Sequence, residues 1–404
     1  MRGLLAGLFL AALAGAAQAQ GYARDGRTCD GYPRAPIETA KGLCAGIVLA
    51  PPPGGLPPSR RTLHLPRTLL SLPGGDLLVA DLGTWDPGRG SVWRLTPRPG
   101  GEPTLKRLLT RLDMPHTLAL GPDGKVYLGE MSRISRFDPD AVDPQASLAP
   151  VVTGLPDNRL HENRHPLSAF LFDADGALLV NVGAPSDQCP PRPGETTCAE
   201  GERQAAVWRF APSGPGAWAA EPIIFARGLR NSLAMVRTRA GAILQAENSI
   251  DVKTPAWPPE ELNVLKAGGH YGWPYCMGAG QPAPAWKALR PKCATYVKPH
   301  LLMPAHAAPL DMVEYQGAMF PHLQGRVIVS LHGYRSTGSR LLAYELDAGG
   351  LPKAGPLDLT PGWRAVKGRR PDGAPVGMAV AADGALWVAD DRNGAILRFA
   401  RDRR

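Results

Sequence analysis

One short sequence motif recurs six times along the 404-residue chain: a tight turn containing glycine, followed by a strand of alternating apolar residues. The copies are Leu72–Asp81, Gly121–Glu130, Asp173–Asn181, Arg239–Glu247, Leu323–Ser330 and Ala382–Asp390. Self-similarity of this kind marks a repeat architecture in which each unit buries its apolar face against the next unit.

A second apolar strand follows each copy, and a third precedes several of them. The following strands are expected at Ser91–Leu95, Arg133–Phe137, Ala206–Phe210, Glu261–Leu265, Arg340–Tyr344 and Ala395–Phe399. The 47 glycines and 43 prolines support many tight turns and few helices. Six units of three or four strands predict an all-β fold, a six-bladed β-propeller.

The first residues have the pattern of an export signal. Arg2 is followed by the apolar run Leu4–Ala14 and by Ala17-Gln18-Ala19, a small-x-small cleavage site. We therefore expect a cleaved signal peptide over 1–19, the alternative being an uncleaved anchor, and a periplasmic or secreted protein without a later membrane span. An N-terminal arm over 20–60 and a propeller over 61–404 follow.

The six cysteines fall into pairs that are close in sequence. An even number in an oxidising compartment indicates disulfides. Of the fifteen possible connectivities, local pairing is the simplest, and it gives Cys29–Cys44, Cys189–Cys198 and Cys276–Cys293. No Cys-x-x-Cys occurs, which disfavours zinc and covalent haem.

Extra length lies between Asn181 and Gln324, where two of these cysteine pairs also fall. Insertions between regular blades commonly build a site on one face, although they can also be decoration. The net charge of +9 comes from scattered residues, which favours anionic small molecules over nucleic acid as partners. Neither a Gly-x-Gly-x-x-Gly nor a Gly-x-Ser-x-Gly motif is present, which disfavours nicotinamide use and an α/β-hydrolase.

The stretch from Ala226 to Cys276 carries the densest pattern of polar residues. A cation and an amide, Arg230 and Asn231, precede a strand that ends in the acidic run Glu247–Asp251. This order suits a loop face that holds an anionic ligand beside a metal ion.

Three runs in this stretch resemble the soluble PQQ-dependent sugar dehydrogenase family, and most of all its sorbosone dehydrogenase branch. They are Gly228-Leu-Arg-Asn231, Glu260-Glu-Leu-Asn263 and Gly268–Pro274, and further matches are Ala308-Pro309, Glu314–Pro321, Val329–Gly333 and Pro375–Gly384. The resemblance implies a six-bladed propeller that uses pyrroloquinoline quinone (PQQ) and Ca²⁺ to oxidise a sugar or aldehyde. An external acceptor, a quinone or cytochrome, would take the electrons.

The resemblance also implies roles for single residues. By this resemblance, His165 corresponds to the family's general base, and His161 is the alternative candidate. A neutral imidazole is suited to this role, since it can take a hydroxyl proton near pH 7. Arg230 and Asn231 correspond to the pair that contacts the quinone, with Arg230 also stabilising charge during catalysis. His306 and His332 are expected as further cofactor contacts.

Calcium prefers six to eight oxygen ligands, including backbone carbonyls. The carbonyls of Ser249 and Ile250 are the expected ligands, with Glu247 and Asp251 ligating or supporting.

The chain departs from the family pattern at several cofactor-facing positions. His332 stands where lysine is common, Arg164 where an aspartate is common, and Gly373-Ala-Pro-Val376 where arginines are common, with Arg369 and Arg370 upstream as substitutes. Two alternatives therefore stay open: a non-catalytic propeller that binds a carbohydrate or protein, and a Ca²⁺-dependent lactonase.

Overall fold

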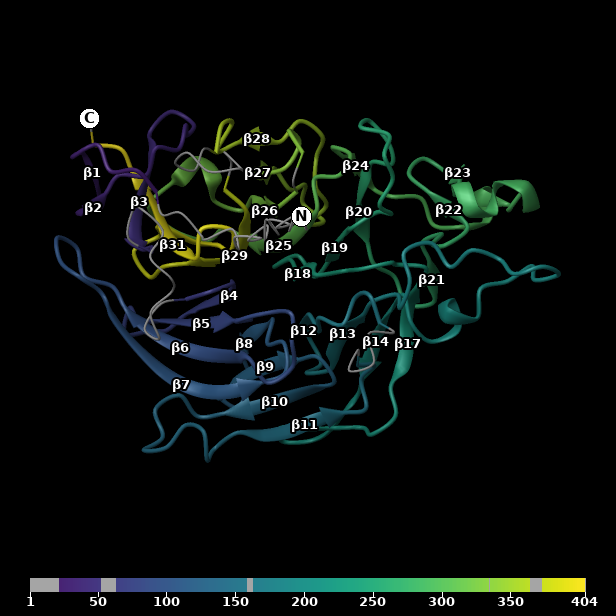
Figure 1. Ribbon diagram of the computed structural model, residues 1–404, viewed down its shortest axis with the longest axis horizontal. Helices are drawn as coiled ribbons and strands as arrows, with labels where there is room; N and C mark the ends of the chain where they lie inside the picture. Colours follow the sequence, from purple (N-terminus) through teal and green to yellow (C-terminus); the bar gives the residue numbers. More distant parts are fainter. Residues whose placement is uncertain (1–21, 52–62, 158–162, 334, 364–372, 404) are drawn as a thin grey trace, which may run out of the picture.

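The computed structural model describes residues 22–51, 63–157, 163–333, 335–363 and 373–403. Within these residues, six antiparallel sheets of four principal strands follow one another around a ring (Figure 1). The innermost strand of the last sheet, β29 (Pro375–Val380), contacts β4 (Pro66–Ser71) of the first sheet and β25 (Pro309–Glu314) of the fifth. The chain is therefore a six-bladed β-propeller, which confirms the predicted fold class.

Each blade is a meander. The first three blades contain β4, β5 (Leu77–Asp81), β6 (Gly90–Thr96) and β7 (Thr104–Leu112); β8 (Leu118–Leu120), β9 (Val126–Glu130), β10 (Arg133–Phe137) and β11 (Ala149–Thr153); and β12 (Phe170–Phe172), β13 (Leu178–Val182), β14 (Ala206–Phe210) and β17 (Ile223–Arg227). The other three contain β18 (Ala234–Arg237), β19 (Ile243–Glu247), β20 (Glu260–Val264) and β24 (Leu301–Met303); β25, β26 (Val327–Leu331), β27 (Arg340–Tyr344) and β28 (Leu357–Asp358); and β29, β30 (Leu386–Asp390), β31 (Ala395–Arg401) and β3 (Leu43–Leu49).

Short elements decorate this frame. They are the hairpins β1–β2 (Thr28–Cys29 and Tyr32–Pro33), β15–β16 (Pro212–Gly214 and Ala217–Trp218) and β22–β23 (Cys276–Met277 and Gln281–Pro282), the strand β21 (Gly269–His270) beside β17, and the 3₁₀ turns η1 (Ala199–Glu202), η2 (Pro284–Leu289), η3 (Cys293–Thr295) and η4 (Pro321–Leu323). None of the helical turns in the described residues has the length and hydropathy that a membrane crossing requires.

The repeated sequence motif forms the second strand of every blade. In the last copy, for example, the Asp-Gly turn precedes β30, and the expected strand Ala395–Phe399 lies within β31. All five residues of β5, β9, β13, β19, β26 and β30 are buried. These strands are covered on both faces because neighbouring blades pack face to face, and their apolar residues form the core between blades.

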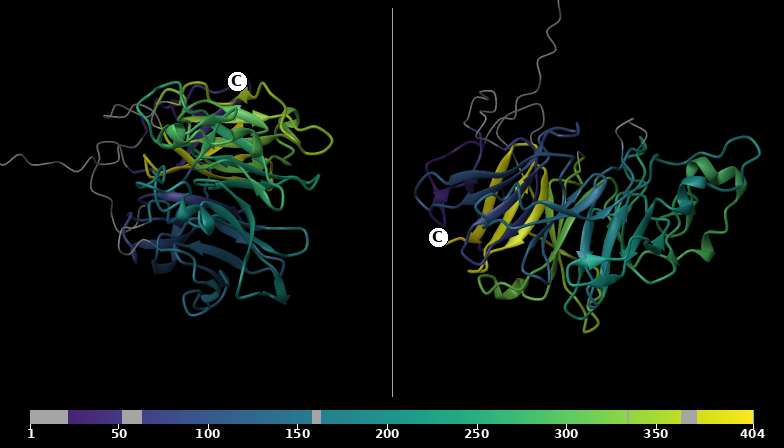
Figure 2. Two further views of the ribbon diagram at one scale, coloured as in Figure 1. Left: turned by 90° about the vertical axis from the view of Figure 1, so that its right-hand side faces the viewer. Right: turned by 90° about the horizontal axis from the view of Figure 1, so that it is seen from below.

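The sixth blade takes its outer strand from the other end of the chain. β3 pairs antiparallel with β31, from Leu43 opposite Arg401 to Leu49 opposite Ile396. The purple and yellow segments accordingly lie side by side in Figure 2. The segment expected to be an arm, 20–60, thus contributes a strand to the ring, and the expected signal peptide over 1–19 lies outside the described residues.

The three local disulfides are confirmed: Cys29–Cys44, Cys189–Cys198 and Cys276–Cys293. The first ties β1 to the closing strand β3. The other two staple the long insertions that extend from the third and fourth blades, and β22 and β23 lie at the periphery of the molecule in Figure 1.

Closure of the ring predicts a large difference between two leucine truncations. Leu397 is fully buried in β31, opposite Ile47 of β3 and Val388 of β30, whereas Leu357 of β28 is 38% exposed. Leu397→Ala should lower the free energy of unfolding by about 2–5 kcal/mol, because it leaves a cavity in the closing blade. Leu357→Ala should change it by about 0.5 kcal/mol or less. Denaturant unfolding measures both, and equal losses would contradict the closure.

Candidate functional site

A cavity of about 860 Å³ opens among loops that all lie at one end of the propeller. In each blade the first and second strands are antiparallel, so the residues before the first strand and those after the second meet at the same end. Arg230 and Asn231 precede β18, Ser249 follows β19, and His332 follows β26, and all four line the cavity. The topology therefore explains why residues far apart in sequence share one pocket.

His165 lies in the cavity wall, in the segment before β12, with its ring oriented by the backbone. Its Nδ1 is 2.6 Å from the carbonyl oxygen of Ala184. Because a carbonyl only accepts, Nδ1 carries the proton and Nε2 keeps its lone pair. The close approach needs Gly183, since a Cβ there would lie 2.5 Å from the Cβ of His165.

Two effects keep the His165 ring neutral. Burial first and the charge of Arg230 second lower the pKa of His165 from 6.5 to about 3. The ring is therefore a neutral acceptor throughout the physiological pH range. Its rival His161 lies outside the described residues.

Arg230 is buried and held by four hydrogen bonds, one of them a long bond of 3.5 Å from Nη2 to Asp251. Nη1 donates to the carbonyl of Asn248 at 2.9 Å, while Nε and Nη2 donate to one carboxylate oxygen of Asp187 at 3.0 and 2.6 Å. Asp187 does not follow from any motif in the sequence, because it lies in the irregular loop after β13. Arg230 thus faces the cavity with its position fixed and its charge partly compensated.

Glu247 supports the Arg230-Asn231 pair from behind. Its carboxylate accepts the backbone N–H of Asn231 at 3.0 Å and the Nε2 amide of Gln245 at 2.7 Å. Burial raises the pKa of Glu247 to about 7. Glu247 does not line the large cavity but a smaller one.

This smaller cavity, of about 10 Å³, has room for about one water-sized group. Its oxygen-bearing walls include Glu247, Glu261, Ser249 and Ile250. Burial, reinforced by the charge of Glu247, raises the pKa of Glu261 to about 8. In the described part of the chain, no hydrogen bond reaches the carbonyl oxygens of Ser249 and Ile250. Two buried carboxylates and two uncommitted carbonyls form a donor set that fits a hard cation.

Asp251 lines the large cavity and not this smaller one. Its carboxylate is 67% exposed, pairs with Arg164 at 2.7 Å, and lies 3.5 Å from Arg230. Arg164, at the position where the family commonly has an aspartate, therefore compensates Asp251 at the rim of the large cavity.

A buried chain of hydrogen-bonded polar side chains forms another part of the cavity wall. Nε2 of His332 donates to Asp391 at 2.9 Å, and Arg67 donates to the other oxygen of Asp391 at 2.6 Å. Burial opposes ionisation of Asp391, but His332 and Arg67 hold its pKa below the ordinary value. This nitrogen of His332 is therefore committed to an internal carboxylate.

His306 lines the cavity with a backbone in the left-handed region, at φ 58°. Its Nε2 lies 2.8 and 2.9 Å from the carbonyls of Thr254 and Trp257, so it carries a proton and holds that loop. Its other ring nitrogen is the one left for a ligand.

Cations dominate the charged lining of the cavity. The arginines are Arg67, Arg164, Arg230, Arg335 and Arg392, and the acids are Asp251, Glu260 and Asp391. Arg335 donates to the carbonyls of Val252 and Thr254 at 2.7 and 3.1 Å, and within the described residues no carboxylate pairs with it. Arg392 comes from the last blade, near the Gly373–Val376 segment that lacks arginines, and Arg369 and Arg370 lie outside the described residues.

The structure gathers the residues that the sequence singled out into two adjacent cavities. His165, Arg230, Asn231, Ser249, Asp251, His306 and His332 line the larger one, and Glu247, Ser249 and Ile250 line the smaller. Sequence reasoning missed Arg67, Asp187, Arg335 and Asp391, which lie outside the family-like runs. It also missed Trp85, which is 55% exposed and is the one Trp, Tyr or Phe side chain among the described residues that line the large cavity.

The environment of His165 predicts an unusual titration. In the ligand-free protein the ring should stay neutral from pH 8 to about pH 4, well below the ordinary histidine range. Arg230→Gln should raise the pKa of His165, because the neighbouring positive charge is removed. NMR of ¹⁵N-labelled histidine measures both, and titration of the wild-type ring near pH 6.5 would contradict this description of the site.

Solved structures share the fold over nearly the whole chain. The PQQ domain of pyranose dehydrogenase from Coprinopsis cinerea, in its holo form, matches with a TM-score of 0.68 and 21% identity, covering 93% of this chain and 100% of that one. The PQQ-bound aldose sugar dehydrogenase from Streptomyces coelicolor matches with a TM-score of 0.57 and 19% identity, covering 90% and 100%.

Sequence comparisons give the family. An uncharacterised protein of Borreliella burgdorferi is 30% identical over 113 residues, which are 27% of this chain and 30% of that relative's length. The profile of the glucose/sorbosone dehydrogenase family matches residues 128–398, more than half of the chain. The chain therefore belongs to the glucose/sorbosone dehydrogenase family.

Proposed function

We propose that this protein is an exported quinoprotein dehydrogenase that oxidises a sugar or aldehyde with PQQ and Ca²⁺. The observation that carries the proposal is a neutral His165, whose Nε2 makes no hydrogen bond to the described residues, in the same cavity as a fixed Arg230. The related domain from Coprinopsis cinerea and the enzyme from Streptomyces coelicolor are described with PQQ, which supports the choice of cofactor.

The lining of the large cavity fits a flat tricarboxylate such as PQQ. Its volume of about 860 Å³ lies within the ordinary range of small-molecule sites. Arginines outnumber carboxylates in the lining, and among the described residues Arg335 donates to backbone carbonyls and to no carboxylate. We propose that Arg335 and Arg392 take the place of the arginines that the Gly373–Val376 segment lacks. Asn231 and Nδ1 of His306 would add polar contacts, whereas His332 would act through Asp391.

His165 would act as the general base. The substrate C–H bond breaks with its electron pair leaving as hydride, while the hydroxyl proton goes to Nε2 of His165. Nδ1 keeps its proton on the Ala184 carbonyl, which holds the ring in the one tautomer that can accept. PQQ, when bound, supplies the hydride acceptor that no side chain of this protein can provide.

Arg230 would stabilise the negative charge that develops on the acceptor. Four of its N–H groups are committed to Asp187, Asn248 and Asp251, so the remaining donor on Nη1 is held in place before the reaction begins. Pre-oriented donors of this kind are effective because they need no reorganisation as charge develops. Trp85 at the cavity wall offers an apolar face against which a sugar ring can pack.

Ca²⁺ would occupy the Ser249 turn. The carbonyls of Ser249 and Ile250 and the carboxylate of Glu247 are the proposed ligands, with Glu261 as an addition from the structure. Asp251 would support the turn through its backbone N–H rather than its carboxylate. Calcium bound there would supply a Lewis acid close to the large cavity.

A Ca²⁺-dependent lactonase is the second candidate, favoured by the oxygen-lined small cavity, which needs no quinone. The non-catalytic alternative predicts that a His165→Ala variant behaves like the wild-type protein. For the proposed oxidoreductase, an external quinone or cytochrome would take the electrons, and export to the periplasm or medium would follow from the N-terminal sequence.

Reconstitution tests the proposed reaction. Purified protein with PQQ and Ca²⁺ should reduce an artificial electron-accepting dye in the presence of aldoses, and His165→Ala should lower kcat by about 10²–10⁴-fold, because the base is lost. His322→Ala, in the η4 turn and outside the cavity, is the matched control and should leave kcat unchanged. Dye reduction that is equal in both variants would contradict the role of His165, and lactone turnover with Ca²⁺ alone would favour the second candidate.

Thermal unfolding tests calcium binding separately from the reaction. After chelation, adding Ca²⁺ should raise the Tm of the wild-type protein by about 3 °C or more, since a ligand of the folded state stabilises it. Glu261→Gln should abolish the rise, whereas Asp175→Asn, an exposed aspartate in the β12–β13 turn, should retain it. An unchanged response of Glu261→Gln would exclude the small cavity as the calcium site.

A further inference from the structure

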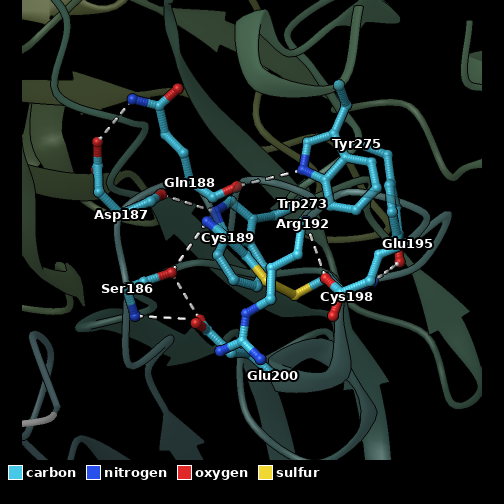
Figure 3. Close-up of a disulfide and its surroundings, with 11 residues drawn as sticks. Ser186, Asp187, Gln188, Cys189, Arg192, Glu195, Cys198, Glu200, Trp273 and Tyr275 are labelled. Atoms are coloured by element: carbon cyan, nitrogen blue, oxygen red, sulfur yellow. Dashed lines mark hydrogen bonds between the residues drawn. A yellow bond between two sulfur atoms is a disulfide. The ribbon is translucent and has the colours of Figure 1, made fainter. Parts of the chain in front are cut away.

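The loop between β13 and β14 is an insertion closed by the Cys189–Cys198 disulfide (Figure 3). It reaches the wall of the large cavity through an ion pair with Arg230. Asp187 lies in this loop, two residues before Cys189. No motif in the sequence assigns it a role. It is not among the residues that line the cavity, yet it contacts one that is.

One carboxylate oxygen of Asp187 collects three donors. Nε and Nη2 of Arg230 and the backbone N–H of Asp251 all donate to Oδ1, at 3.0, 2.6 and 3.1 Å. The side chain of Arg230 is 5% exposed and that of Asp187 17% exposed. A single atom therefore ties the cavity-facing arginine to the turn that contains the proposed calcium ligands.

Hydrogen bonds from two sides fix the loop that carries Asp187. Within the loop, the hydroxyl of Ser186 donates to Glu200 at 2.7 Å and accepts the N–H of Cys189 at 2.9 Å (Figure 3). From the opposite side, Nε1 of Trp273 donates to the carbonyl of Asp187 at 3.1 Å.

Two more bonds join the same loop to the aromatic residues of the second insertion. Nε1 of Trp286 donates to the carbonyl of Gln188 at 3.3 Å, and the N–H of Cys198 donates to the hydroxyl of Tyr275 at 2.9 Å. The two disulfide insertions therefore brace each other around Asp187, and they are more than surface decoration.

We propose that Asp187 is a positioning residue, which fixes Arg230 and the Ser249–Asp251 turn so that both face their ligands. It acts through Arg230, because it lies behind the cavity wall. The inference rests on the proposed function for its ligands, but the positioning itself is a property of the ligand-free protein.

Hydrogen–deuterium exchange of the ligand-free protein tests the positioning. Asp187→Ala should speed exchange of the Asp251 amide by about ten-fold or more, because its acceptor is lost. Asp187→Asn should retain slow exchange, since its Oδ1 can accept the same three donors. Asp175→Asn, which alters an aspartate paired with Arg209 on the same blade, is the matched control and should not change it.

The exchange measurement tests the positioning role of Asp187 independently of PQQ binding. Unchanged exchange in Asp187→Ala would overturn it, and so would equal acceleration in Asp187→Asn. If Asp187→Ala does not fold, Asp187→Ser provides the same test, because its side chain is too short to reach Arg230.

A double-mutant cycle on PQQ affinity tests the route through Arg230. Asp187→Ala should weaken PQQ binding by about ten-fold or more, as expected for loss of bonds to a charged group. In an Arg230→Gln background the same change should weaken it by less than about two-fold. Equal losses in both backgrounds would contradict action through Arg230. A wild-type protein that binds no PQQ would refute the proposed function and leave the exchange result standing.

Discussion

The antiparallel alternation of strands within each blade is the constraint on which the rest of the structure depends. It brings the residues before every first strand and after every second strand to one end of the ring. The fully buried second strands hold these ends in register, because neighbouring blades cover both of their faces. His165, Arg230 and His332 belong to three different blades, and their meeting in one cavity is a consequence of this alternation.

Electrostatics then divides the site into two parts. The large cavity is lined by more arginines than carboxylates, which suits an anionic ligand, and the same positive charge helps keep His165 neutral. The small cavity contains two buried glutamates whose pKa values are raised by burial, an arrangement that favours a bound cation. Arg230 and Ser249 line both cavities, so binding in one part is expected to affect the other.

The sequence predicted the parts of this arrangement that rest on local chemistry. Gly-containing turns followed by alternating strands identify every blade, and the spacing of the cysteines identifies every disulfide. The closing strand β3 was not predicted, because its partner β31 lies at the opposite end of the chain. Asp187 and Arg67 were missed because each acts through a partner that is distant in sequence. Asp187 also lies in an irregular loop, which gives no periodic signal. Asp251 carries the residue type expected of a calcium ligand. Its carboxylate nevertheless pairs with the guanidinium groups of Arg164 and Arg230.

A crystal structure of the protein reconstituted with PQQ and Ca²⁺ is the sharpest test of the proposed site. We expect the quinone in the large cavity, with Arg230 donating to it and Nε2 of His165 facing it, and a calcium ion bound by the carbonyls of Ser249 and Ile250. PQQ bound elsewhere, or a saturated protein whose large cavity holds no quinone, would refute the proposed site.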